Sequence, residues 1–317
     1  MSNTIMGIED NFCEAAAELG LYPPGFTRYG EARVMITALP CGRGEDAAPN
    51  AENPVGSIAG FAQKNFYREL VTRLRSLLRR AGETVAKEAR IFCNSRLPEK
   101  ELAVRAGLGF AGKNSLLIIP GAGSLFVLGG ILFPGASGDT PKPPAALEAD
   151  GMCGNCEACI AACPTGAIKE GGRIDLTLCI QAHAAQVRSL PSVVRDAWGI
   201  RLYGCGVCQD VCPHNDAPPP CAQTACGHIG PSVSLAKILA AGDTKLRKAL
   251  FKGTTLDVSW ISPVAIKRNA IIAAAHQKAH VLLPVLERYR RHTHPLLRET
   301  AVWAITKHLE TTKKRLP

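Results

Sequence analysis

The sequence lacks a long continuous apolar run. One uncharged stretch spans residues 114–138, but Pro120 and Pro134 interrupt it together with several glycines. A membrane-spanning helix needs about 20 continuous apolar residues. The stretch instead predicts two buried strands, Leu116–Ile119 and Leu125–Phe133, joined by a glycine-rich turn. We therefore expect no membrane partner.

The sequence also has few charges, and their distribution is uneven. Only 20% of the residues are charged and 46% are hydrophobic, so the chain can bury a sizeable core. Residues 237–317 hold sixteen Lys or Arg but five Asp or Glu, which accounts for the net charge of +10. A basic region on a nearly neutral body favours an anionic polymer, nucleic acid first, as partner. A solvated basic helical surface is the alternative. Because no heptad pattern is present, we expect a monomer.

Cysteine, by contrast, is abundant, with thirteen residues. The run from Cys153 to Pro164 has the spacing C-x2-C-x2-C-x3-C-P of bacterial ferredoxins. The run from Cys205 to Pro213 lacks its first cysteine at close range, and Cys179 supplies it. Since the fourth cysteine of each run ligates the other cluster, two [4Fe–4S] clusters are predicted. The ligands are Cys153, Cys156, Cys159 and Cys212 for cluster one, and Cys163, Cys179, Cys205 and Cys208 for cluster two.

Structural zinc and a disulfide framework are the alternative interpretations of these cysteines. Zinc favours four ligands in two C-x2-C pairs, not runs that end in Cys-Pro. Thiols in such number, and clusters sensitive to oxidation, suit a reducing compartment. Residues 1–20 carry four acidic and no basic side chains, unlike a secretory signal. We therefore expect a cytoplasmic protein.

The pattern along the chain predicts three domains. Residues 1–145 read as an α/β domain, residues 146–230 contain the cysteine runs, and residues 231–317 are helical. The elements expected in the first domain are strands at Arg33–Leu39 and Val85–Cys93 and helices at Tyr67–Arg80 and from Pro98 to Gly107. Residues 139–144 read as a linker.

Two helices near the end of the sequence look related. They are Ile261–Gln277 and His294–Leu309, and each places basic residues ahead of a small and apolar face. The pattern indicates either a HEAT-like fragment or an ordinary helical hairpin.

Four features resemble the epoxyqueuosine reductase family along most of the chain. They are Leu102–Asn114, Gly123–Gly129, the cysteine pattern with its displaced Cys179, and Tyr203–Asn215. The terminal helices, with Lys267-Arg268-Asn269, resemble the HEAT-like end of that family.

The resemblance implies a nitroreductase-like cobalamin-binding domain, a ferredoxin-like domain with two [4Fe–4S] clusters and a tRNA-binding helical region. The implied reaction removes the epoxide oxygen of epoxyqueuosine in a tRNA anticodon stem-loop. Its electrons come through the clusters from an external donor such as flavodoxin or ferredoxin. The implied cobalamin contacts are Gly107, Gly109, Lys113, Asn114 and Ser124, and the implied tRNA contacts are Lys267, Arg268 and Arg298.

The chain departs from the family where the substrate is expected. The family has an Asp, its proposed proton donor, ahead of the segment that contains Gly107, followed by Ser or Thr. Here Cys93 and Asn94 stand in those positions. A thiol can donate a proton when its pKa is suitable. Where the family reads Asp-Tyr-His, the chain keeps only Tyr67, which is an alternative acid. Cys93, Asn94 and Tyr67 are the catalytic candidates.

Two other functions remain open at this point. One is a related cobalamin- and [4Fe–4S]-dependent reductase, or a dehalogenase-like enzyme, that acts on a different substrate. The other is a ferredoxin-like electron carrier.

Overall fold

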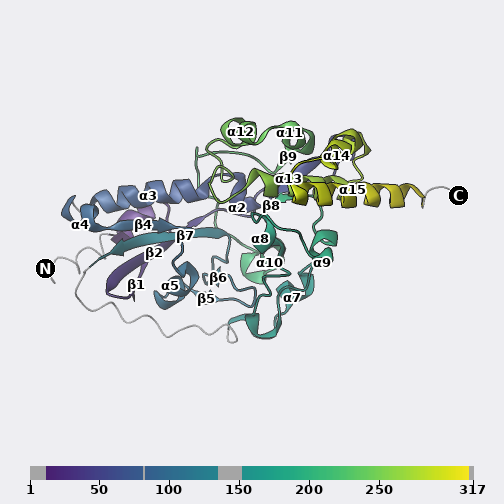
Figure 1. Ribbon diagram of the computed structural model, residues 1–317. Coiled ribbons are helices and arrows are strands. Elements are labelled where there is room, and N and C mark those ends of the chain that lie inside the picture. Colours follow the sequence, from purple (N-terminus) through teal and green to yellow (C-terminus); the bar gives the residue numbers. More distant parts are fainter. Residues whose placement is uncertain (1–11, 81–82, 135–151, 314–317) are drawn as a thin grey trace.

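The computed structural model describes residues 12–80, 83–134 and 152–313. Its largest layer is a four-stranded sheet in the order β1-β2-β7-β4 (Figure 1). The strands are β1 Gly25–Tyr29, β2 Ala32–Pro40, β4 Arg90–Cys93 and β7 Phe126–Phe133. All three neighbouring pairs run antiparallel. The predicted α/β class is therefore refined to helices packed on an antiparallel sheet.

Helices cover both faces of this sheet. Helix α3, Phe66–Arg80, lies on one face, and helix α5, Glu99–Arg105, lies on the other (Figure 1). Leu74 of α3 packs with Met35, and Leu102 of α5 packs with Ile36. Alternate residues of β2 thus enter opposite cores, which explains why its seven inner residues are all buried. Each fully buried Leu contributes roughly 1.5–3 kcal/mol to folding.

Most of the elements predicted for the first domain are confirmed. The strand at 33–39, the helix at 67–80, the helix from Pro98 and the strand at 125–133 all appear within one or two residues. The strand predicted at 85–93 is wrong in its first half, because helix α4, Glu83–Glu88, precedes β4. Glu83 in the first turn and Lys87 in the last suit the helix dipole. The remaining elements are α2 Gly60–Gln63, β5 Phe110–Ala111 and β6 Leu117–Ile118, with β5 and β6 forming a short hairpin.

Short elements separate the cysteines. They are α7 Ala158–Ala162, η1 Glu170–Gly172, α8 Ile180–His183, α9 Ser192–Asp196, β8 Arg201–Tyr203, α10 Val207–Asp210 and η2 Pro213–Asn215. The linker predicted at 139–144 lies outside the described residues.

A second, three-stranded sheet joins the three predicted domains. Strand β3, Val55–Ile58, pairs in parallel with β8 and antiparallel with β9, Ser232–Ser234. Each strand comes from a different predicted domain. The proposed boundaries near residues 145 and 230 therefore separate sequence motifs, but they do not separate independent layers.

The last part of the described chain is helical. Its elements are α11 Leu235–Ala240, α12 Asp243–Lys245, η3 Leu246–Leu250, α13 Pro263–His276, η4 His280–Leu282, α14 Leu283–Tyr289 and α15 Pro295–Lys313. Helices α13 and α15 confirm the two helices expected near the end, and they share one core through Ile271 and Ala301. Within residues 12–80, 83–134 and 152–313, no helix is long and apolar enough to cross a membrane.

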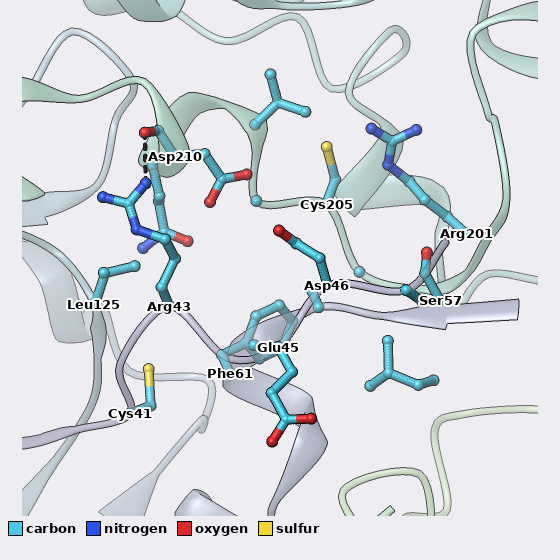
Figure 2. A pocket seen from close by; sticks show the side chains of 18 of the residues that line it. Cys41, Arg43, Glu45, Asp46, Ser57, Phe61, Leu125, Arg201, Cys205 and Asp210 are labelled. Atoms are coloured by element: carbon cyan, nitrogen blue, oxygen red, sulfur yellow. Dashed lines mark hydrogen bonds between the residues drawn. The ribbon is translucent and has the colours of Figure 1, made fainter. Parts of the chain in front are cut away.

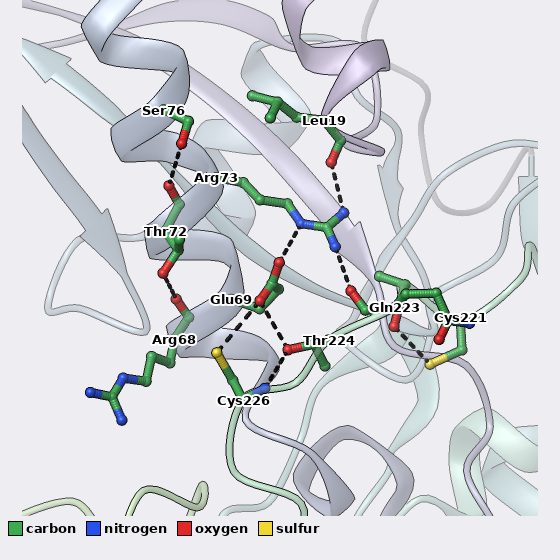
Figure 3. A network of polar contacts seen from close by, with 11 residues as sticks. Leu19, Arg68, Glu69, Thr72, Arg73, Ser76, Cys221, Gln223, Thr224 and Cys226 are labelled. Carbon is green, nitrogen blue, oxygen red and sulfur yellow. Dashed lines mark hydrogen bonds and ion pairs between the residues drawn. The ribbon is translucent and has the colours of Figure 1, made fainter.

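The connector after the cysteine runs, which contains Gln223, Thr224 and Cys226, is hydrogen-bonded to α3 (Figure 3). Glu69 accepts hydrogen bonds from the Thr224 hydroxyl at 2.9 Å and from the Cys226 thiol at 3.5 Å. Arg73 binds Glu69 at 2.8 Å and donates to the carbonyl of Gln223 at 2.6 Å. Burial alone would raise the pKa of Glu69, but the bonds from Arg73 and Thr224 hold it below its usual value. The network links the cysteine region to helix α3 of the sheet domain.

Candidate active site

Four cysteines form an outer thiol group: Cys153, Cys156, Cys159 and Cys212. Burial, and after it the charges of Cys212 and Cys153, raise the pKa of the Cys159 thiol, so these side chains are neighbours. Cys212 is buried against the β5–β6 hairpin with Phe110 and Ile118, whereas Cys156 is exposed. The group therefore reaches from the sheet domain to the protein surface.

Four other cysteines form an inner thiol group: Cys163, Cys179, Cys205 and Cys208. Burial raises the pKa of Cys208 to about 12, with further contributions from Cys205, Cys159, Cys179 and Cys163. Helix α7, which carries Cys159, packs against α10, which carries Cys208, so the two groups are adjacent. The crossed ligand assignment made from spacing stays a prediction, and the division into an inner and an outer group supports it.

Cys163 differs from the other inner thiols. Burial would raise its pKa, but hydrogen bonds from the backbone of Thr165, Ile168 and Ala167 lower it below the usual value. The Ala167 N–H lies 3.3 Å from the sulfur. N–H donors directed at sulfur stabilise a thiolate, which is the form that binds iron.

The thiols do not form a site for a single ion. Among the described residues, no three His, Cys, Asp or Glu side chains are grouped so that they hold one metal ion. In a [4Fe–4S] cluster each cysteine binds a different iron atom, so its ligands need not converge on one point.

A cavity of about 710 Å³ separates the inner thiol group from the sheet domain. All four inner cysteines line it, and no cysteine of the outer group does. Its opposite wall comes from β7, α3 and the loop between β4 and α5, with Leu97, Leu116 and Leu128 among the apolar side chains. The volume is typical of sites for sizeable ligands.

The structure separates the three predicted catalytic residues. Tyr67 and Asn94 line the cavity, but Cys93 does not. The Cys93 thiol lies behind the wall and donates to the Leu128 carbonyl at 3.2 Å. Burial, and then the charge of Glu99, raises the pKa of Cys93 far above its usual value. Burial likewise raises the pKa of Tyr67. Both groups hold their protons tightly.

Glu99 contacts the loop that carries Asn94. Its carboxylate accepts the N–H of Asn94 at 3.2 Å and that of Ser95 at 2.7 Å. Asn94 has φ +50°, a left-handed conformation that Asn tolerates better than most residues. In the first turn of α5, Glu99 suits the helix dipole. The structure adds a second role, because its carboxylate fixes the turn at the cavity wall.

The five residues implied as cobalamin contacts differ in whether they line the cavity. Asn114 and Ser124 line the cavity, whereas Gly107, Gly109 and Lys113 do not. A Cβ at Gly109 would lie 2.1 Å from the Ile118 carbonyl oxygen, so this glycine allows the β5–β6 hairpin to close. Lys113 donates to the carbonyls of Gly154 at 2.8 Å and Cys156 at 3.1 Å. Lys113 therefore supports the loop of the outer thiol group.

Asn215, which sequence reasoning did not single out, joins the cysteine region to the sheet domain. It is fully buried, accepts the Ser124 N–H at 2.7 Å and donates to the Gln209 carbonyl at 2.8 Å. Gly123 has φ +75°, and a Cβ there would lie 2.0 Å from the Asn215 side-chain oxygen. The close approach needs glycine. The only sequence signal for Asn215 was its place at the end of the Tyr203–Asn215 segment.

A smaller cavity of about 230 Å³ lies beside Cys205 (Figure 2). Arg43 donates from one side of it to the carbonyls of Asp210 and Asn215, each at 2.8 Å. Burial raises the pKa of the Asp210 carboxyl, although Arg43 opposes the shift. Arg43 is a second contact between the sheet domain and the cysteine region that the sequence did not reveal.

Lys267 and Arg268, which were predicted to bind RNA, are both buried in the folded chain, so their side chains are not exposed to a partner. Lys267 forms an ion pair with Asp243 at 2.6 Å. Arg268 is 1% exposed and donates to the carbonyls of His183, Gln186 and Arg188 at 2.7–2.9 Å. Arg298 is exposed and remains available on the surface.

Arg268 and Asn269 have a different role. Asn269 donates to the carbonyls of Ala184 and Leu202, both at 2.9 Å. Residues 180–204 separate the inner cysteines Cys179 and Cys205, and all five carbonyls bound by this pair lie in that segment. The guanidinium also lies 5.6 Å from the ring centroid of Trp198. Helix α13 therefore holds the long segment between two inner ligands.

Known proteins resemble this chain in sequence and in fold. Residues 152–215 match the family model "4Fe-4S double cluster binding domain". An Escherichia coli K12 epoxyqueuosine reductase is 32% identical over 274 residues, which cover 83% of this chain and 69% of that protein. A Bacillus anthracis epoxyqueuosine reductase is 33% identical over 216 residues, 67% of this chain and 54% of that protein. The chain thus spans just over half of the length of that Bacillus relative.

Solved structures share the fold. A selenomethionine-labelled epoxyqueuosine reductase superposes with a TM-score of 0.79 at 24% identity, covering 96% of this chain and 91% of that one. Another, solved with an epoxyqueuosine-modified tRNA-Tyr stem-loop, gives 0.77 at 23% identity, covering 99% and 95%.

Fold and cysteine pattern together define an iron–sulfur protein whose thiols face a large cavity in a sheet domain. Within that class, the extent of the sequence similarity to epoxyqueuosine reductases identifies the family. The chain belongs to the epoxyqueuosine reductase family.

Proposed function

We propose that this protein is a cobalamin-dependent reductase that converts epoxyqueuosine to queuosine in the tRNA anticodon. Electrons enter at a [4Fe–4S] cluster on the outer thiol group and pass through a second one on the inner group. The observation that carries the proposal is the one-sided placement of the thiols. Only the inner group lines the cavity, while Cys156 of the outer group reaches the surface. This order supports a relay from solvent to cavity.

The large cavity and the apolar character of its wall support cobalamin as the bound cofactor. Its volume of about 710 Å³ and its mainly apolar lining suit a large, flat macrocycle. Asn114 and Ser124 are the polar residues that would hold it. Cobalamin supplies a cobalt centre whose reduced form is a strong nucleophile toward an epoxide carbon. The protein supplies position and exclusion of water, since Leu97, Leu116 and Leu128 face the same space.

Exposed basic residues on the C-terminal helices support tRNA as the substrate. Arg298 of α15 is exposed, as are Arg290 and Arg291 just before it. Basic side chains neutralise phosphates, and unstacked loop bases are the usual target of RNA-specific proteins. A relative was solved with an epoxyqueuosine-modified stem-loop. We infer that α13, α14 and α15 act as a HEAT-like RNA-binding surface, although Lys267 and Arg268 lie inside it.

The remaining parts of the proposal concern setting and partners. We infer a monomer in a reducing cytoplasm that takes electrons from a small carrier such as flavodoxin or ferredoxin. The exposure of Cys156 supports direct donation from such a carrier at the outer group. The three-domain division stays a functional description, since one sheet joins all three regions.

The test uses the full chain, purified without oxygen and reconstituted with iron, sulfide and cobalamin. We expect corrinoid absorbance to remain with the protein after desalting, and a stem-loop carrying epoxyqueuosine to be converted to queuosine. Failure to bind corrinoid would favour the electron-carrier alternative. Corrinoid binding without turnover of this RNA would favour a related reductase or dehalogenase-like enzyme, which the absence of the family Asp at Cys93 already suggests.

A further inference from the structure

Removing an epoxide oxygen as water consumes protons as well as electrons. The overall change is epoxide plus two electrons plus two protons, giving an alkene and water. The electrons come from the external donor through the clusters of the proposed function. When the first carbon–oxygen bond breaks, the oxygen retains the bonding pair and needs a proton. The position where the family has its acid holds Cys93, so a different group must supply that proton.

Most titratable groups at the cavity are unsuited to this task. The inner thiols are committed to iron. Cys93 does not line the cavity, and burial raises the pKa of both Cys93 and Tyr67. Glu99 is bound by the two backbone N–H groups of residues 94 and 95. Glu101 also lines the cavity, but it forms an ion pair with Arg105 at 3.6 Å.

Lys100 is the cavity-lining group that remains. It comes from the first turn of α5, and its ammonium donates to the Ser115 carbonyl at 2.6 Å. Ser115 also lines the cavity and has φ +61°, a left-handed conformation that fixes the direction of this carbonyl. Within the ranges that the structure describes, no carboxylate lies within 4 Å of the Lys100 ammonium. Desolvation lowers the pKa of Lys100 below its usual value.

The ionic state of Lys100 and its position at the cavity therefore both suit proton donation. An ammonium holds a transferable proton at neutral pH, and a lowered pKa makes the transfer easier. Two of its three N–H bonds are not used by Ser115 and are available to an oxygen in the cavity.

We propose that Lys100 is the proton donor to the epoxide oxygen in this protein, taking the place of the acid that the chain lacks at Cys93. The inference rests on the proposed function. In the step, the carbon–oxygen bond breaks and its electron pair stays on oxygen, while the two electrons from the relay are supplied to the carbon. An N–H bond of Lys100 breaks to form the O–H bond. Lys100 becomes a neutral amine and is reprotonated from solvent. The hydroxyl then leaves as water with a second proton from solvent, and the alkene forms.

The test compares Lys100→Met and Lys100→Arg with the wild-type protein, and uses Lys87→Met on α4 as the matched control. Each protein is reconstituted with clusters and cobalamin and given the stem-loop carrying epoxyqueuosine. Single-turnover rate, RNA affinity and corrinoid absorbance are measured. We expect Lys100→Met to lower the rate at least about 100-fold, as loss of a general acid does, with affinity and absorbance unchanged. Lys87→Met should match the wild type.

The Lys100→Arg variant distinguishes proton donation by Lys100 from a structural role in holding the cavity wall. Arginine keeps the charge and the bond to Ser115 but does not give up its proton in this pH range. If Lys100 only braces the wall, Arg restores the rate and the proposal is overturned. If it donates the proton, Lys100→Arg stays slow. The wild-type rate should also fall as pH rises through the lowered pKa of Lys100, and this dependence should vanish in both variants.

The outcomes distinguish the two levels of the argument. An active wild type with an equally active Lys100→Met overturns the role of Lys100 alone. A wild type that binds corrinoid but leaves epoxyqueuosine unchanged overturns the proposed substrate and, with it, the role of Lys100.

Discussion

The two walls of the large cavity differ in how far the sequence predicts them. On the cysteine side, the predicted ligands fall into two groups, and the inner group lines the cavity. On the sheet side, only Tyr67, Asn94, Asn114 and Ser124 of the predicted residues line it, and Cys93 lies behind the wall. The cysteine wall is encoded by short spacings. The sheet wall is assembled from α3, the loop between β4 and α5, β7 and the β5–β6 hairpin, which lie far apart in the sequence.

The largest effect should come from substituting one cysteine in each of the two thiol groups. Cys205→Ser removes an inner ligand, and Cys156→Ser removes an exposed outer one. In each case we expect iron to fall from about eight to about four atoms per chain, because one [4Fe–4S] cluster is lost. Only Cys205→Ser should perturb the corrinoid spectrum, since Cys205 lines the cavity and Cys156 does not. Identical corrinoid spectra for the two variants would contradict the inner and outer assignment.

The second comparison is between the two arginines predicted to bind RNA. Arg268→Met leaves five buried carbonyl and amide contacts unmet, and we expect a loss of about 3–5 kcal/mol in stability. Arg298→Met removes an exposed side chain, so its effect on stability should stay within about 0.5 kcal/mol. Thermal unfolding under nitrogen measures both.

The same pair of variants tests the assignment of α13. Arg298→Met should weaken stem-loop binding and flatten its salt dependence. Arg268→Met should instead release iron from the inner cluster first, because its contacts lie between Cys179 and Cys205. If Arg268→Met were as stable as Arg298→Met and lost only RNA affinity, the original prediction from sequence would be restored.

The difference between Lys267-Arg268 and the cysteines shows what the sequence can convey. Ligand spacing is a local property, so the cluster assignment could be made without knowing the fold. A charged residue on a helix is expected in solvent, and nothing local reveals that carbonyls of residues 183–188 will surround Arg268. Asn215 and Arg43 were missed for the same reason, since both act on partners more than 80 residues away in sequence.

Two further predictions from the sequence differ from the structure over short segments. Residues 85–93 are apolar enough for a strand, yet Glu83 and Lys87 favour a helix before β4. The glycines of the 107–112 segment looked like an approach surface for a ligand. Gly109 instead admits the Ile118 carbonyl, a contact that depends on the register of a hairpin.

A glycine pair tests how tightly the two walls are joined. Gly121 and Gly123 have nearly equal φ values of +74° and +75°. A Cβ at Gly121 meets nothing within 4 Å, whereas one at Gly123 overlaps the Asn215 side chain. Gly121→Ala should cost about 1 kcal/mol in backbone strain. Gly123→Ala should cost about 2 kcal/mol more, from overpacking. Equal losses of stability in denaturant would show that Asn215 does not fix this junction.

The smallest effect concerns the half-buried Cys93 thiol, which does not line the cavity. Burial holds the pKa of Cys93 far above its usual value of 9.0, so above pH 9 the unfolded chain releases this proton while the folded chain keeps it. The stability that the neutral thiol contributes is complete below pH 9 and declines as pH rises, by at most about 1.4 kcal/mol per pH unit. Cys93→Ala has no such proton, so its unfolding free energy should fall less between pH 8 and pH 10 than that of the wild type. The double difference should be about 1 kcal/mol. Parallel pH curves for the two proteins would mean that the thiol ionises freely in the folded chain. Cys93 would then again be a candidate acid, and the two walls of the cavity would differ less than their geometry indicates.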